Sequence, residues 1–336
     1  MKLQLVLLTV SIAYAFATPT LNVEHEWSNF KLKHGKSYTT PDEETKRQTI
    51  FAETLKEIEE HNKKFEEGLV TFTMSVNQFS DMTDEELSTR SGLQPEHNLE
   101  DLGVEVKQFK RPEKFTLPDE LDWSLKGAVT PIKNQLACES CWAFATTGVL
   151  EAQYFLKTGE LKSLSEKNLM DCADGSYGSH SCHKGTYAGA LMYVRDNKGI
   201  EAEETYPYQP VDGKCLYEAK NNVFKNVSVK HIYRIEEDNE VDLKIALATV
   251  GPIAVAVYSH DRTFKHYKDG IYYNDNCKRV DHAVLLVGYG TENGVDYWLI
   301  KNSWGEDWGI KGYGKMARNR CSNCGIAYMP YYAELS

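Results

Sequence analysis

The sequence predicts an α+β protein with two lobes. Helical patterns occupy the first part of the chain and short strand patterns dominate after about Phe224, an order typical of helices and sheet gathered in separate layers. The 336 residues are 41% hydrophobic and 11% aromatic, enough to form buried cores. The net charge of −11, without a long Lys/Arg block, disfavours a nucleic-acid partner and an anionic membrane surface.

The N-terminus has the pattern of a secretory signal peptide over residues 1–17. Met1-Lys2 precedes an apolar run from Leu3 to Phe16 that is too short to span a bilayer and ends among small residues. The alternative is a buried N-terminal helix. No later segment is long and apolar enough to cross a membrane. We therefore expect a soluble mature protein in the lysosome or an extracellular or digestive lumen, and the sequon at Asn226 fits that route.

A charged helical region follows the signal. Short helical spacing covers Glu24 to Lys33, and a longer helix is predicted from Glu43 to Glu67. The longer helix carries one apolar stripe, which needs a partner surface to bury it. From Asn98 to Pro118 the chain has no clear period and contains two prolines, which predicts an extended linker open to proteases.

The rest of the chain begins with helices and ends with strands. A mostly apolar helix is predicted from Cys141 to Leu156, and residues 117–222 should be mainly helical. Four of the later strands are predicted by short apolar runs between Gly, Asn and Asp clusters: Ile253 to Tyr258, Ala283 to Tyr289, Tyr297 to Ile300 and Tyr313 to Met316.

Eight cysteines in an oxidising compartment should be mostly paired. Two Cys-x-x-Cys pairs, at Cys138/Cys141 and Cys321/Cys324, raise the alternative of a zinc site. The pairs lie about 180 residues apart, whereas compact zinc ribbons separate them by about 15–20. We therefore expect no metal.

The run PIKNQLACESCWAF, from Pro131 to Phe144, resembles the papain and cathepsin L family. The resemblance implies that Gln135 contributes to an oxyanion hole, that Cys138 forms a disulfide and that Cys141 is the nucleophile. The chemistry agrees, because a helix N-terminus and a nearby imidazolium both stabilise a thiolate.

Two later runs supply the expected partners of the thiol. VDHAVLLVGYG contains His282, the base, and WLIKNSWG contains Asn302, the orienter, with Trp304 as a shield over their hydrogen bond. His282 lies 141 residues after Cys141, inside the family's window of about 130–150. Asn302 lies 161 residues after it, somewhat beyond that window.

The N-terminal region resembles the inhibitory propeptide of cathepsin L-type enzymes. The matching residues are Glu43, Arg47, Phe51, Ile58, Asn62, Asn77, Phe79 and Asp81, while Thr54 stands where the family usually has Asn. The resemblance implies a papain-like fold, with a helical left lobe and a β-barrel-like right lobe in residues 117–336, behind an inhibitory propeptide in residues 18–116. A prosegment acting as a separate protease inhibitor is a further alternative.

The resemblance also implies a reaction and its sites. The expected activity is endopeptidase cleavage of protein or peptide substrates through an acyl-enzyme on Cys141, by a monomer without cofactor. The implied disulfides are Cys138–Cys182, Cys172–Cys215 and Cys277–Cys324, which leave Cys321 over. An apolar pocket for the P2 residue should be lined by Thr186, Tyr187, Ala256, Val280 and Met329, and Gly185, Asp281 and Trp304 should also contact substrate.

Three positions depart from the family's usual glycine: Leu136, Glu139 and Lys184. Glu139 and Lys184 should flank the nucleophile on one wall of the cleft, where we expect them to form an ion pair. The functional interpretation is a charged rim that alters peptide preference; the alternative is two exposed side chains worth little to each other. A catalytically impaired homologue that binds peptides or partners therefore remains the rival to an active enzyme.

Overall fold

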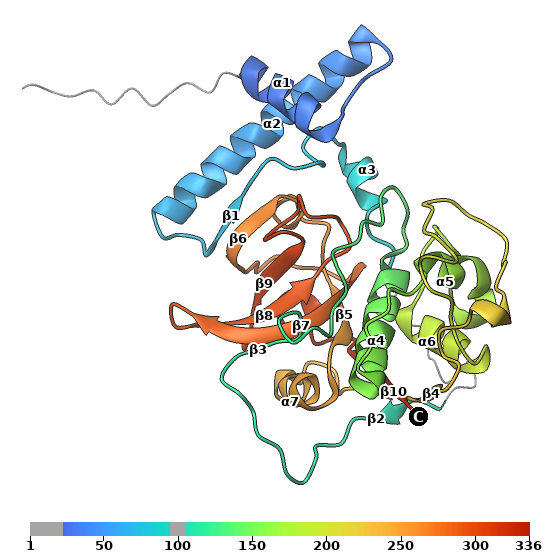
Figure 1. Cartoon of the computed structure of the whole chain (residues 1–336). Coiled ribbons are helices and arrows are strands. Elements are labelled where there is room, and N and C mark those ends of the chain that lie inside the picture. Colours follow the sequence, from blue (N-terminus) through green and yellow to red (C-terminus); the bar gives the residue numbers. More distant parts are fainter. Residues whose placement is uncertain (1–22, 95–104) are drawn as a thin grey trace, which may run out of the picture.

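The structure is a computed structural model that describes residues 23–94 and 105–336. The predicted signal peptide and the first part of the predicted linker lie outside these residues. Figure 1 shows a helical lobe beside a sheet lobe, with two blue helices over the sheet lobe. The α+β prediction is confirmed.

The N-terminal region folds as a small helical unit with one strand. Its helices are α1 (Val23–His34), α2 (Pro41–Glu66) and α3 (Asp84–Ser88), and its strand is β1 (Phe72–Met74). Thr40 caps α2, because its side chain accepts a hydrogen bond from the Glu43 N–H. Pro41 is the first residue of the helix, a position where its missing N–H removes no hydrogen bond within the helix. A separate core of Trp27, Phe30, Phe51 and Leu55 joins α1 to α2.

The helical lobe is built around the central helix α4. Its helices are α4 (Cys141–Thr158), α5 (Glu166–Cys172) and α6 (Tyr187–Asp196), with the short helices η2 (Gly175–Tyr177) and η3 (Ala219–Asn221). The helix α4 ends where Gly159 adopts a left-handed φ of 79°. It is buried on nearly every side of its first three turns because it lies between α6 and the sheet.

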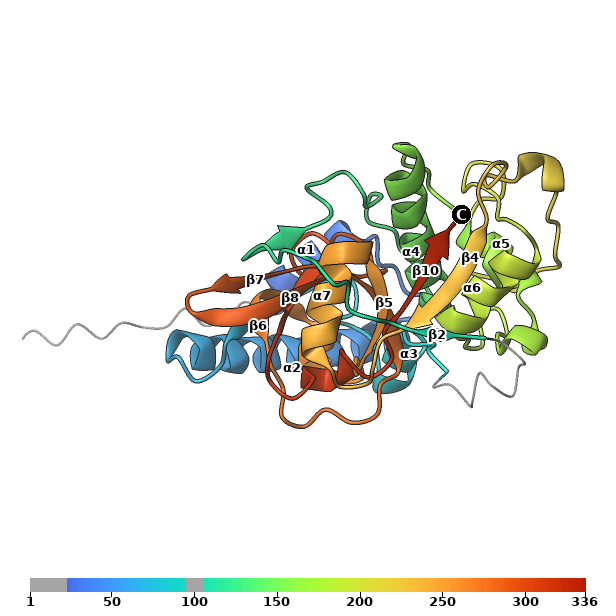
Figure 2. The same cartoon turned by 90° about the horizontal axis from the view of Figure 1, so that it is seen from below.

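The sheet lobe contains most of the strands. They are β3 (Leu121–Asp122), β4 (Val229–Arg234), β5 (Ile253–Val257), β6 (Tyr267–Tyr272), β7 (His282–Glu292), β8 (Val295–Lys301), β9 (Tyr313–Ala317) and β10 (Tyr331–Leu335). The helices of this lobe are α7 (Glu240–Val250), α8 (Arg262–Lys265) and η4 (Asn323–Gly325). Figure 2 shows α7 against this sheet. The expectation of strands alone after Phe224 was incomplete, because Asn239 caps α7 and Leu243, Ala246 and Leu247 form its buried face.

Strands from the N-terminal region lie at both edges of the sheet. The strand order is β1-β6-β9-β8-β7-β5-β10-β4-β2, with β3 paired to β7. The strand β1 pairs antiparallel with β6, and β2 (Lys107–Gln108), which lies within the predicted linker, pairs parallel with β4. Each added strand covers backbone groups that an edge would otherwise expose.

Candidate active site

The structure brings Cys141, His282 and Asn302 together where the two lobes meet. Cys141 begins α4, and its Sγ accepts a hydrogen bond from the Ala283 N–H of β7 at 3.4 Å. His282 begins β7 and pairs with Val257 of β5, so the sheet fixes its backbone. Asn302 follows β8, the next strand of the sheet.

The His282–Asn302 hydrogen bond sets the imidazole tautomer. His282 Nε2 lies 2.8 Å from Asn302 Oδ1, and the Ser303 N–H donates to the same oxygen at 2.8 Å. Because that atom accepts from a backbone donor, Nε2 must carry the proton. His282 Nδ1 is buried without a hydrogen-bond partner. In the neutral ring it is therefore a free acceptor beside the start of α4.

Trp304 covers this hydrogen bond. Its ring stacks on His282, with centroids 4.5 Å apart and planes at 26°, and it is only 1% exposed. Removing water from the His282–Asn302 pair strengthens the pair electrostatically.

Gln135 faces a carbonyl of the N-terminal region. Its Nε2 donates to Arg90 O at 3.1 Å and to Cys138 O at 2.7 Å, while its Oε1 accepts from Ser303 Oγ at 2.7 Å. Trp304 Nε1 donates to the same Arg90 oxygen at 3.1 Å. The Gln135 amide is thus fixed with a donor directed at a bound carbonyl oxygen.

Residues 90–94 run directly over the thiol. The Gly92 N–H donates to Cys141 Sγ at 3.3 Å, and the Leu93 N–H donates to Asp281 O at 3.0 Å. On the opposite wall, Gly185 exchanges backbone hydrogen bonds with Gly92 and Gln94. A Cβ on Gly92 would lie 1.9 Å from Glu139 O. Only glycine lets the segment come this close, and the cleft is closed to any other peptide.

This coverage also changes the ionisation of both groups. Burial raises the pKa of the Cys141 thiol to about 12. Burial and the nearby charge of Lys265 lower the pKa of His282 to about 3. In the covered state the pair is therefore a neutral thiol and a neutral imidazole, because both ions would lose their hydration.

The predicted apolar pocket residues are gathered beside this crossing. Thr186, Tyr187, Ala256, Val280 and Met329 are each at most 5% exposed. Leu93 is 3% exposed, and its backbone pairs with Gly185 and with Asp281, the chain neighbours of Thr186 and Val280. Gly185 supports this wall, because a Cβ there would lie 2.5 Å from the Trp142 ring.

The three departures from glycine do not behave alike. Leu136 and Lys184 keep left-handed φ values of 53° and 78°, a conformation that glycine adopts at least cost, and both side chains are exposed. Glu139 has no positive φ, and its N–H donates to Cys182 O at 3.2 Å. Within residues 23–94 and 105–336, no ion pair joins Glu139 to Lys184, so the pairing expectation is wrong for this state. Burial raises the pKa of Glu139, and the charge of Lys184 only offsets part of that rise.

The structure contains three disulfides, Cys138–Cys182, Cys172–Cys215 and Cys277–Cys324, the pairs that the resemblance implies. Cys141 is free and buried, and Cys321 is free and exposed. Asn226 is exposed. Among the described residues, no group of His, Cys, Asp and Glu side chains is arranged to hold a metal ion, and no helix is long and apolar enough to cross a membrane.

Two functional features escaped the sequence analysis. The first is a buried ionic cluster behind Asn302, in which Lys133 Nζ lies 2.8 Å from Glu151 and 2.7 Å from Glu166. Burial opposes the charge of Lys133, but the two carboxylates outweigh it and raise its pKa. Glu151 within the apolar run of α4 was the available signal. The second is Lys265, which is fully buried next to the site.

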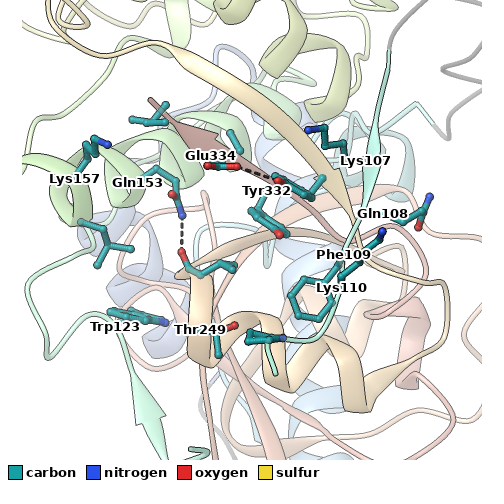
Figure 3. A pocket seen from close by; sticks show the side chains of 16 residues that line it. Lys107, Gln108, Phe109, Lys110, Trp123, Gln153, Lys157, Thr249, Tyr332 and Glu334 are labelled. Atoms are coloured by element: carbon teal, nitrogen blue, oxygen red, sulfur yellow. Dashed lines mark hydrogen bonds between the residues drawn. The ribbon is translucent and has the colours of Figure 1, made fainter. Parts of the chain in front are cut away.

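A cavity of about 950 Å³ lies away from the thiol, at the far end of α4. Figure 3 shows it between the segment at Phe109, the end of α4 at Lys157 and the strand β10 at Tyr332. Since Cys141 begins α4 and Lys157 ends it, roughly 24 Å separates this cavity from the reactive group. It is not part of the candidate active site.

Comparisons with known proteins agree with this geometry. Residues 117–334 match the papain family cysteine protease domain, and residues 27–87 match the cathepsin propeptide inhibitor domain (I29). The chain is 45% identical to digestive cysteine proteinase 1 of Homarus americanus over 94% of each chain, and 41% identical to human cathepsin L2 over the whole of both. Digestive procathepsin L2 of Tenebrio molitor has a TM-score of 0.87 and 39% identity, over 93% of this chain and 99% of that one.

Proposed function

The chain belongs to the papain family of cysteine proteases, and on that premise we propose how its residues perform the reaction. It is a cathepsin L-like cysteine endopeptidase made as a zymogen with its own propeptide inhibitor domain. We propose Cys141 as nucleophile, His282 as base, Asn302 as orienter and Gln135 as oxyanion donor. The observation that carries the assignment is the His282–Asn302 bond, which leaves Nδ1 as a free acceptor, while the N–H of the next residue, Ala283, is bonded to the Cys141 thiol.

The proposed reaction is acyl transfer in two stages. With the cleft open, the thiol proton passes to His282 Nδ1 and the thiolate attacks the scissile carbonyl carbon. The Gln135 amide and the Cys141 N–H stabilise the negative oxygen, and Arg90 O shows that the amide can hold a carbonyl oxygen. His282 then protonates the leaving amine, and water hydrolyses the thioester with His282 as base.

Latency follows from the covered cleft. We propose residues 18–116 as the propeptide, residues 117–336 as the peptidase domain and residues 1–17 as the signal peptide. The segment at Gly92 blocks the thiol, and burial holds both catalytic groups neutral. The three unusual residues do not favour an impaired homologue, because Leu136 and Lys184 are exposed and Glu139 is only half-buried.

Acid should loosen the folded propeptide, and with it the docked state, through groups whose pKa is lowered by contacts within the propeptide. Hydrogen bonding to Arg47 lowers the pKa of Glu86 to about 2, so its stabilisation is complete above its ordinary value of 4.5 and is lost as pH falls toward 2. Burial lowers the pKa of His61, because the buried imidazole is held neutral. The folded state therefore loses stability relative to the unfolded state as pH falls below about 6.5. We propose that the histidine responds first as the compartment acidifies.

Leu93 supports a preference for an apolar or aromatic P2 residue. It is buried, and its backbone pairs with Gly185 and Asp281, which adjoin Thr186 and Val280 of the predicted pocket. We further propose that the protein is a monomer, that it is glycosylated at Asn226 and that its substrates are proteins or peptides. The digestive proteinases among its relatives favour a lysosomal or digestive lumen.

The test uses the purified precursor and two cysteine variants. Acidification should remove the propeptide and release activity on a short peptide with Leu at P2. Cys141→Ala should abolish that activity, whereas Cys321→Ala, the matched change at the exposed free cysteine, should retain it. A wild-type protein that is processed correctly and labelled at Cys141 yet cleaves no peptide would favour the impaired homologue.

A further inference from the structure

Lys265 is a buried cation at the edge of the active site. It ends α8 and is 1% exposed. Its Nζ lies 4.2 Å above the Trp304 ring centroid and 3.3 Å from Ser91 Oγ. Within the described parts of the chain, no carboxylate forms an ion pair with it. A buried ammonium with only a hydroxyl and an aromatic face as partners is costly, so a structural role explains it poorly.

The crossing segment locates Lys265 relative to the scissile bond. Gly92 lies over the thiol, and the next residue, Leu93, is buried and pairs with Gly185, the neighbour of Thr186 in the predicted P2 pocket. The preceding residue, Ser91, contacts Lys265. Lys265 and the P2 pocket therefore lie on opposite sides of Cys141. A substrate with its P2 side chain in that pocket places the residue after the scissile bond, P1′, on the side of Lys265.

The propeptide contacts this lysine at two points, through Ser91 Oγ on Nζ at 3.3 Å and through Asn77 Nδ2, which donates to the Lys265 carbonyl oxygen at 2.8 Å. Burial lowers the pKa of Lys265 to about 7 in the covered state, with Arg90 acting in the same direction and Asp281 and Cys141 against it. Asp281 is already engaged, since its carboxylate accepts from the Ser259 N–H at 2.7 Å and lies 3.2 Å from His260. Once Ser91 leaves, Nζ gains access to solvent and to any anion in the cleft.

We propose that Lys265 is a specificity residue of the mature enzyme that binds a carboxylate on the leaving side of the scissile bond. The carboxylate has two sources, an Asp or Glu side chain at P1′ or the chain terminus when P1′ is the last residue. The inference rests on the proposed function. Below neutral pH the amine is charged, and above about pH 4 substrate carboxylates are ionised, so the preference should be full between these limits.

The experiment compares matched peptides on the acid-activated enzyme at about pH 5.5, above the ordinary carboxyl pKa of about 4. One pair has Leu at P2 and differs only in Glu or Gln at P1′. A second pair ends at P1′ with a free carboxylate or an amide. At least one pair should show a kcat/KM ratio of about ten in favour of the charged member, the size of one charge-assisted hydrogen bond.

Variants assign that ratio to Lys265. Lys265→Met should bring it close to one, and Lys265→Glu should reverse it in favour of a Lys at P1′. Lys268→Met, which removes an exposed lysine three residues away, should leave it unchanged. Because the ratio is taken within one preparation, partial misfolding of a variant does not affect it. The pair that responds identifies the source of the carboxylate.

Two results would overturn the inference. In the first, wild-type enzyme cleaves both peptide pairs with kcat/KM ratios near one, which would show that Lys265 binds no substrate carboxylate. In the second, the ratio persists in Lys265→Met, which would assign the preference to another residue. Both leave the proposed function intact, since the peptides are still cleaved by Cys141. A wild-type enzyme that cleaves none of the peptides removes the proposed function and this inference together.

Discussion

The two edges of the sheet are covered in different ways by strands that precede the matched peptidase domain. At one edge, β1 pairs with β6 through three residues, and Phe72 and Met74 are each 3% exposed. At the other edge, β2 pairs with β4 through two residues, and Gln108 is exposed. Both are strand additions, which supply backbone hydrogen bonds to an open edge.

The β6 edge is fixed by side chains as well as backbone. Arg262 of the peptidase domain donates to Glu57 of α2 at 2.9 Å, to Asp84 of α3 at 2.9 Å and to Thr54 at 2.7 Å. Thr54 is the residue that departs from the usual propeptide signature, and here it accepts this hydrogen bond. Two helices of the N-terminal region, α2 and α3, therefore converge on one cation through three side chains.

The β4 edge has fewer and more exposed contacts. Phe109 is half-buried, with its ring centroid 6.5 Å from that of Tyr332 and its N–H bonded to Arg234 O at 2.8 Å. Arg111 pairs with Asp242 while 53% exposed. These contacts predict that the β6 edge and the cleft hold the proposed propeptide, and that the β4 edge detaches first, next to the proposed maturation site.

Matched aromatic truncations should separate the two edges by the largest margin. Phe72→Ala removes a buried ring whose centroid lies 4.4 Å from that of His61 and 4.7 Å from that of Tyr272. The loss of about 3–5 kcal/mol should expose the thiol about two to four orders of magnitude more often. Phe109→Ala should raise the frequency of thiol exposure less than about tenfold, because the Phe109 ring is already half-exposed.

The readout is alkylation of Cys141 in the neutral precursor, in a Cys321→Ala background that removes the exposed thiol. Equal unmasking by the two variants would show that the edges contribute equally.

Gly92→Ala tests the cleft itself. The added Cβ would meet Glu139 O at 1.9 Å, so the crossing segment must move off the thiol. An overpacking cost of about 1–3 kcal/mol predicts alkylation about ten to a hundred times faster at neutral pH. Thr89→Ala, an exposed change three residues earlier, is the control. Unchanged alkylation in Gly92→Ala would mean that the cleft segment contributes little to latency.

Glu86→Gln sharpens the comparison through pH. Arg47 Nη2 donates to Glu86 at 2.6 Å, and the Thr83 N–H donates to it at 2.9 Å. Because the Glu86 side chain is partly exposed, its loss should cost only about 1 kcal/mol above pH 4.5. Below that pH the wild-type advantage should decline progressively and be lost as pH falls toward 2, where Glu86 is protonated in the folded protein.

Thermal unfolding of Cys141→Ala precursors across this pH range measures the effect without self-processing. Glu85→Gln, at an exposed neighbouring carboxylate, is the matched control. A Glu86 effect that stays constant from pH 6 to pH 3 would contradict the titration.

Arg111→Ala should have the smallest effect. The exposed pair with Asp242 is worth at most about 1 kcal/mol, and salt should weaken it further. Alkylation of Cys141 should rise less than about fivefold. A larger rise, absent from Lys110→Ala, would show that the β4 edge is a primary anchor.

The sequence predicted the local elements well where one pattern decided them. The apolar run of α4, the long helix α2 and the four strands named in advance are all present within a few residues. The helix α7 was missed because its single buried face is short and lies between strand patterns. The edge strand β2 was missed because its pairing with β4 depends on a partner more than a hundred residues away.

By itself the sequence determined the order and type of the groups that now meet, Gln135, Cys141, His282 and Asn302, because their flanking runs are distinctive. Only the tertiary structure decided which atoms face one another: Arg90 O on Gln135, Gly92 on the thiol, and Lys265 over Trp304. It also decided that Glu139 and Lys184 remain unpaired. The physical reason is that helix and strand periodicity are local, whereas burial and close contact, which set these pKa values and hydrogen bonds, arise only when distant segments pack.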